Sequence, residues 1–369
     1  MSNKPIKNVG NQAFILPDAT TEQQLPEAYT PLYNAKGTNA LATIPTSPVR
    51  TGYKFKYITA TDKYSLFTAD DVEITVDNLA HPLYGRPIQF YYYLLTKFTK
   101  KTPHTSKGID FTRPEAREIP LDTTEYLKIR GKEITPSNRK NAAKEITSYV
   151  NILLNMFIKF DEKEPKSSQN KSYCLRLLSG LTKKGRTYSI LLSPDVLSYL
   201  FDKHYITNFP NAAFQIDVMR HPSAFSLAYI LSVFYSENRG KDNQGIVSLG
   251  ALLKYLSDIP QPDEIRDDRH LTRRIIDPLE ENLRHLEEIE ILDSWEWANA
   301  KREPLTEAQF NKIIDKGAYE VLAECFLNYK MKYYPEGKPA LEAPKETKMA
   351  DLKHPERCKP NPQKAEAQK

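Results

Sequence analysis

Apolar side chains recur at helical spacing through the first part of residues 84–193 and predict three consecutive helices. The first helix begins near Pro87. The second is short and follows Asp122, whose carboxylate can accept hydrogen bonds from the amides of the first turn. The third begins at Ser137, which is expected to cap it, and runs to about Phe160.

Apolar and polar residues then alternate in two short segments, residues 173–178 and 187–192. This alternation is typical of half-buried β-strands. The link between the segments holds Gly185 flanked by basic residues. The pattern therefore predicts a β-hairpin with a basic tip.

The same order of elements returns in residues 222–335. Helices are predicted over residues 224–237, in a short segment capped by Ser248, and over residues 268–288. Strands are predicted near residues 289–297 and 325–333, although residues 321–333 also fit a helix. Between those strands, residues 306–316 predict a short helical insertion.

The junction between the two blocks and one proline need separate comment. Residues 194–203 predict a helix, and residues 214–218 a short extended piece. Pro278 falls inside the third helix of the second block, where it removes a backbone hydrogen bond. It therefore predicts either a bend or the end of one helix and the start of another.

Three helices followed by a hairpin, occurring twice, predict an α+β protein with two tandem winged-helix domains. We expect a flexible arm over residues 1–50, a first winged-helix domain over 51–205, a second over 206–335 and a disordered basic tail over 336–369. The N-terminal stretch is rich in proline and polar residues, and the tail has almost no large apolar side chains.

Winged-helix proteins place the third helix in the DNA major groove and the hairpin on the neighbouring backbone. In the first block, the third helix carries a polar stripe opposite its apolar face, and the hairpin tip is basic. Lysine and arginine bind phosphates, and asparagine can read base edges. The candidate DNA-binding residues are Asn138, Arg139, Lys140, Asn141, Lys144, Ser148, Lys183, Lys184 and Arg186. A solvated helix face is the alternative.

In the second block, a basic cluster lies at the start of the third helix. Its members are Arg266, Arg269, His270, Arg273 and Arg274. Their forked guanidinium groups suit guanine edges or phosphates. The later part of this helix is acidic and is expected to face away from a phosphate chain.

Charge and composition restrict the function classes. The net charge is only +5, and the tail from residue 338 onward holds eight basic and five acidic residues. The body is therefore nearly neutral, and DNA binding has to rest on local clusters. Three distant cysteines argue against a disulfide framework. No apolar run has the length of a membrane helix or a signal peptide, so we expect a cytoplasmic protein.

No enzyme motif is evident, and we expect a binding protein with no cofactor and no metal. The seven histidines include no His-x-His pair of the kind that rolling-circle initiators use. Gly240-Lys241-Asp242 lacks both the upstream glycine and the hydroxyl of a phosphate-binding loop. The cysteines and histidines are not clustered as zinc ligands.

One segment of the second block resembles a known family. Residues 273–282, Arg-Arg-Ile-Ile-Asp-Pro-Leu-Glu-Glu-Asn, follow the helix capped by Ser248 and are similar to the recognition helix of initiator proteins from iteron-type, theta-replicating plasmids. Residues 188–201 and 225–235 are similar to that family's junction between its two domains. The inserted residues 301–316, the long N-terminal arm and the acidic helix end depart from the family pattern.

The resemblance implies a protein that binds direct repeats at a plasmid origin, helps to melt DNA and recruits host replication proteins. It also implies a homodimer in equilibrium with a monomer. Two alternatives stay open: a winged-helix transcriptional regulator with a single operator, and a winged-helix module that binds proteins, for which residues 90–93, Phe-Tyr-Tyr-Tyr, could supply an interface or simply core.

Overall fold

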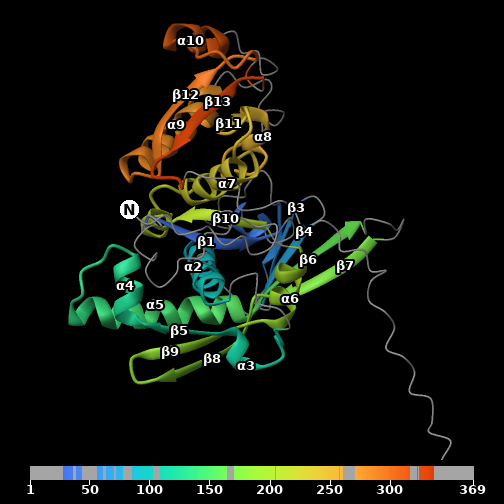
Figure 1. Ribbon diagram of the computed structural model, residues 1–369, viewed down its shortest axis with the longest axis vertical. Helices are drawn as coiled ribbons and strands as arrows, with labels where there is room; N and C mark the ends of the chain where they lie inside the picture. The colour runs from blue at the N-terminus through green and yellow to red at the C-terminus, as the bar shows by residue number, and fades with distance from the viewer. Residues whose placement is uncertain are drawn as a thin grey trace, which may run out of the picture.

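The computed structural model describes two winged-helix units that lie one above the other (Figure 1). The residues it describes are 28–35, 39–43, 56–60, 64–69, 72–77, 85–102, 109–163, 170–203, 205–256, 258–260, 271–315, 322 and 324–335. The predicted C-terminal tail lies outside these ranges.

The first unit contains four helices, of which α3 is a single turn, and a three-stranded sheet. Helix α2 (Gly85–Lys101) is followed by the short helix α3 (Pro114–Arg117), strand β5 (Glu118–Asp122), helix α4 (Thr123–Ile129) and helix α5 (Pro136–Leu154). Strands β8 (Leu178–Lys184) and β9 (Thr187–Leu192) form the hairpin, and β9 pairs with both β8 and β5. Asp122 caps α4 as predicted, by accepting from the amides of Thr124 and Glu125.

The second unit repeats this order. Helix α7 (Ala224–Glu237), strand β11 (Ile246–Ser248) and helix α8 (Leu249–Leu253) precede the third helix, which consists of a π-helical turn η4 (Thr272–Ile276) and helix α9 (Asp277–Glu288). Strands β12 (Leu292–Ala298) and β13 (Phe326–Met331) follow, with helix α10 (Glu307–Asp315) between them.

The two units share one topology. In each sheet the last strand lies in the middle, between the unit's first strand and its hairpin partner, in the orders β5-β9-β8 and β11-β13-β12. Ser248 caps α8 as predicted, through a hydrogen bond from the amide of Ala251. The α+β class and the tandem winged-helix architecture predicted from the sequence are confirmed. The alternative of a helix over residues 321–333 is wrong for β13.

The first unit carries an additional sheet. Strands β2 (Lys56–Ala60), β3 (Tyr64–Ala69), β4 (Val72–Asp77), β6 (Met156–Lys163) and β7 (Asn170–Arg176) form an antiparallel five-stranded sheet in that order. The prediction that α5 continues to Phe160 and that residues 173–178 form the hairpin is therefore wrong. The apolar residues Phe157 and Phe160 belong to β6, because α5 ends at Leu154.

The prediction of a flexible N-terminal arm is wrong for part of the arm. Strand β1 (Tyr29–Asn34) pairs antiparallel with strand β10 (Tyr205–Pro210), and a 3-10 turn η1 (Ala40–Thr43) follows. Leu32 and Tyr33 are completely buried. The rest of residues 1–50 lies outside the described ranges, and the predicted domain boundary at residues 205 and 206 falls at the start of β10.

The junction between the units is aromatic. Helix α6 (Pro194–Lys203) forms as predicted, whereas the predicted extended piece includes a 3-10 helix η2 (Asn211–Gln215). Tyr92 of α2 and Tyr229 of α7 lie with ring centroids 4.8 Å apart, and both rings are fully buried. Strand β1 spans the same junction, because the Tyr29 hydroxyl donates to the carbonyl of Lys332 at 2.6 Å.

Replacing Gly245 with alanine is expected to destabilise the second unit. Gly245 has φ +73°, and an added Cβ would lie 2.3 Å from the carbonyl oxygen of Tyr329. Gly240 is a matched control, because it has φ +70° and open space around an added Cβ. We expect Gly240→Ala to cost about 1 kcal/mol, from backbone strain alone, and Gly245→Ala about 3 kcal/mol in urea unfolding. Equal losses for the two variants would contradict the steric explanation.

Candidate nucleic-acid interface

Helix α5 begins directly after a threonine cap. Thr135, rather than the predicted Ser137, is the N-cap, because its hydroxyl accepts from the amide of Asn138 at 3.1 Å. Pro136 occupies the first helical position, where its missing N–H leaves no hydrogen bond unmade. Ser137 is then an exposed residue of the first turn.

The polar stripe of α5 is largely exposed. Lys140, Asn141, Lys144 and Ser148 are all exposed, opposite the buried residues Ala142, Ile146 and Val150. The other two predicted residues are half-buried. One of them, Asn138, donates through its side-chain amide to the carbonyl of Glu133 at 2.9 Å. Asn138 and Arg139 are therefore less accessible than the four residues that follow them.

The hairpin presents its basic residues at the tip, as predicted. Gly185 has φ +63°, a left-handed conformation that permits the tight turn between β8 and β9. Lys183, Lys184 and Arg186 surround it and are exposed. In Figure 1 this turn and the start of α5 lie at the same end of the first unit.

Tyr188 ties the hairpin to α5. It is fully buried on β9, and its hydroxyl donates to the carbonyl of Ala143 in α5 at 3.2 Å. The ammonium of Lys183 lies 5.2 Å from the centre of the same ring. Because Ala143 precedes Lys144, this contact brings the basic tip beside the exposed stripe. Tyr188 was not among the predicted site residues, although its place beside the basic tip in an alternating strand was the available signal.

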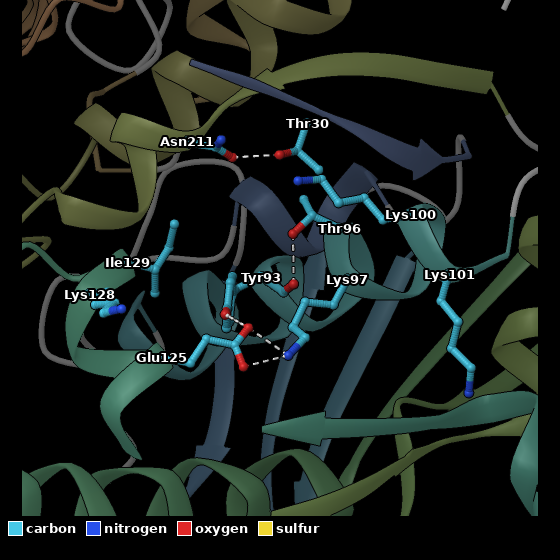
Figure 2. A pocket seen from close by; sticks show the side chains of 10 residues that line it. All are labelled: Thr30, Tyr93, Thr96, Lys97, Lys100, Lys101, Glu125, Lys128, Ile129 and Asn211. Carbon is cyan, nitrogen blue, oxygen red and sulfur yellow. Dashed lines mark hydrogen bonds and ion pairs between the residues drawn. The ribbon is translucent and has the colours of Figure 1, made fainter. Parts of the chain in front are cut away.

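A hollow of about 640 Å³ between α2 and α4 holds further lysines (Figure 2). Lys97 is neutralised there, because its ammonium lies 2.6 Å from the carboxylate of Glu125. The amines of Lys100, Lys101 and Lys128 point in different directions. They do not converge on one point, as a preformed site for a small anion would require. The hollow therefore contributes positive charge beside α4, but it does not form a binding site for a small anion.

The third helix of the second unit changes pitch at Pro278. The amide of Asp277 donates to the carbonyl of Thr272, five residues earlier, which makes the preceding turn π-helical. Pro278 has no N–H to continue the α-helical pattern. The helical run nevertheless continues through it from Leu271 to Glu288. Pro278 therefore marks a change of pitch within one helix, not its end.

The structure describes two of the five predicted residues at this helix start. Arg273 is exposed and Arg274 is half-buried. The other three, Arg266, Arg269 and His270, lie outside the described residues. Beyond Arg274, the exposed residues of α9 are mostly acidic, namely Asp277, Glu281, Glu287 and Glu288, with Arg284 among them. Any contact with phosphates along this helix is thus concentrated at its start.

Two stacked histidines hold α9 against the junction. The rings of His221 and His285 lie 3.8 Å apart at an interplanar angle of 10°. His221 belongs to the turn that follows Asp217, and Asp217 pairs with Arg86 of α2 at 3.1 Å. Burial and the neighbouring His221 lower the pKa of His285, while Glu288 and Glu281 act in the opposite direction. The chain of contacts links the third helix of the second unit to the first helix of the first.

This histidine pair is expected to make stability depend on pH. Because the pKa of His285 is lower in the folded state, the unfolded chain binds more protons, and stability is lost as pH falls through the unfolded value of about 6.5. His285→Gln should flatten the dependence of the unfolding free energy between about pH 7 and 5. Glu288→Gln should steepen it, because that carboxylate raises the pKa of His285. Parallel curves for all three proteins would contradict this account.

The described part of the chain shows neither a metal-binding cluster nor a membrane-spanning helix. No group of three or more His, Cys, Asp or Glu residues there could hold a metal ion. None of the helices in the same part is long and apolar enough to cross a membrane.

Comparisons with known proteins find similar structures but no similar sequence family. No family model and no curated protein matches the chain. A crystal structure of domains 2 and 3 of RctB covers 68% of this chain and 85% of its own, with 13% identity and a TM-score of 0.37. The Pi initiator protein in complex with iteron DNA covers 84% of this chain and 100% of its own, with 10% identity and a TM-score of 0.44.

Proposed function

We propose that this protein is a sequence-specific, double-stranded DNA-binding replication initiator that binds direct repeats at a plasmid origin. The observation that carries the proposal is the duplicated winged-helix topology, in which the third helix and hairpin of the first unit present exposed cations at one end. No catalytic step is part of the proposal.

The chemistry of this surface suits a phosphate backbone beside readable bases. Lys140 and Lys144 are exposed on α5 and have no ion-pair partner among the described residues. Each lysine that meets a phosphate releases condensed counterions, which favours binding and makes it salt-dependent. Asn141 and Ser148 lie on the same exposed stripe and can donate to base edges or accept from them.

The finer parts of the proposal rest on the presence of two third helices and on the resemblance of residues 273–282 to the recognition helix of initiators. Two third helices held in one molecule suit a protein that occupies adjacent sites on repeated DNA. We include in the proposal a dimer in equilibrium with a monomer, melting of neighbouring DNA, recruitment of host replication proteins and a location in the bacterial cytoplasm.

Replacing both Lys140 and Lys144 with alanine should weaken DNA binding through lost phosphate contacts. Each lost contact is expected to lower the slope of log affinity against log salt by about 0.9, so the double variant should lose nearly 2. The measurement is salt-titrated fluorescence anisotropy on the DNA that flanks the protein's own coding sequence. Lys171→Ala with Lys241→Ala is a control of equal charge, because both lysines are exposed and lie outside α5 and the β8–β9 hairpin. The control should keep the wild-type slope.

Footprinting on the same DNA separates the possible functions. Protection of several evenly spaced direct repeats supports the initiator. Protection of one isolated palindrome would indicate a transcriptional regulator instead. Binding no tighter than to shuffled duplex would refute origin binding and favour a protein-interaction module.

A further inference from the structure

A tight turn at the end of β12 stands where the wing of the second unit begins. Ala298 and Pro304 form an isolated bridge that closes the turn. Inside it, the amide of Asn299 donates to the carbonyl of Glu303 at 2.9 Å, and the amide of Arg302 donates to the carbonyl of Asn299 at 2.8 Å. In the first unit the chain turns back at the same point of the topology, between β8 and β9.

The side chain of Asn299 fixes this turn. Its Oδ1 accepts from the amides of Lys301 at 2.8 Å and Glu303 at 3.1 Å. Its Nδ2 donates to the carboxylate of Glu303 at 3.0 Å, which draws that acid back onto Asn299. The turn is therefore organised by its own side chains before any ligand is present.

The residue at the tip is an arginine in a conformation that favours glycine. Arg302 has φ +68°, close to the +63° of Gly185 in the first hairpin. A side chain makes this conformation unfavourable, so its presence there needs an explanation. Lys301 and Arg302 are both exposed, and neither has an ion-pair partner among the described residues. The turn thus projects two cations.

Trp297 holds this turn beside the third helix. Its indole Nε1 donates to Glu280 of α9 at 3.0 Å, and its ring stacks on Phe310 of α10 at 4.9 Å. Its carbonyl accepts from the amide of Leu305 at 2.8 Å, so both ends of the turn are fixed next to the same residue. Helix α10, which interrupts the hairpin, supports the turn through the stacking of Phe310 on Trp297.

We propose that residues 299–303 are the phosphate-binding wing of the second unit, in which Lys301 and Arg302 contact the DNA backbone beside the helix that starts at Arg273. This inference rests on the proposed DNA-binding function and adds a contact outside the helices. The ligand group is a phosphodiester, which the arginine fork can bind through two parallel hydrogen bonds.

The test replaces Arg302 with glycine, which removes the charge while accepting the same backbone conformation. We expect the thermal midpoint to stay the same or rise, because φ +68° is unstrained for glycine. In anisotropy titrations, the salt slope should fall by about 0.9 and the affinity at moderate salt by roughly tenfold. Arg302→Lys should retain most of the slope, since the charge remains.

Asn299→Ala is the second variant, because it keeps both cations and removes the hydrogen bonds that organise the turn. We expect weaker binding with an unchanged salt slope, as a mobile wing has to be ordered on binding. Wild-type affinity and slope in both Arg302→Gly and Asn299→Ala would overturn the proposed wing. If the double variant of Lys140 and Lys144 loses affinity in the same assay, only the wing is refuted. If the wild-type protein binds no duplex, both proposals fail.

Discussion

The contact between the first helices of the two units, α2 and α7, is the constraint on which the rest of the molecule depends. Tyr92 and Tyr229 meet there at 4.8 Å without exposure to solvent, and the Tyr229 hydroxyl donates to Asn39. A buried aromatic pair of this kind tolerates little displacement, because both rings would lose their contacts together. The two third helices therefore hold a fixed relation to each other, and the stacked histidines reinforce it from the side of α9.

This rigid arrangement explains how a nearly neutral body can present a basic surface. The cations of the first unit come from α5 and the β8–β9 hairpin, which Tyr188 links, and those of the second come from the helix start and from the turn beside Trp297. Each cluster is small, and its effect depends on the backbone that supports it. Local geometry, more than total charge, decides where a polyanion would lie.

The sequence predicted the helices well because their signals are local. Asp122 and Ser248 are each the cap of a helix and also the last residue of a strand. The caps were predicted, but the strands β5 and β11 were not, because both are short and are defined by pairing with strands far along the chain. The same limit hid β1 and β10, whose partners are separated by most of the first unit. At the candidate interface, residue type and helical spacing placed Lys140 and Lys144 on the exposed face of α5. The partial burial of Arg139 and the positive φ of Arg302 depend on tertiary structure, which the spacing of residues along the sequence does not reveal.

Strand β1 has a consequence for the way the chain is made. Its partner strand follows about half the chain later, and Tyr29 reaches a carbonyl 303 residues away, at Lys332. On the ribosome, where chains emerge from the N-terminus, this strand stays without β10 until the first unit has been made, and Tyr29 stays without Lys332 until the second unit has been made. Docking of Tyr29 is then among the last events of folding, and a chain truncated before Lys332 cannot complete it. The first strand of the described residues therefore completes its contacts only after the second unit has been made.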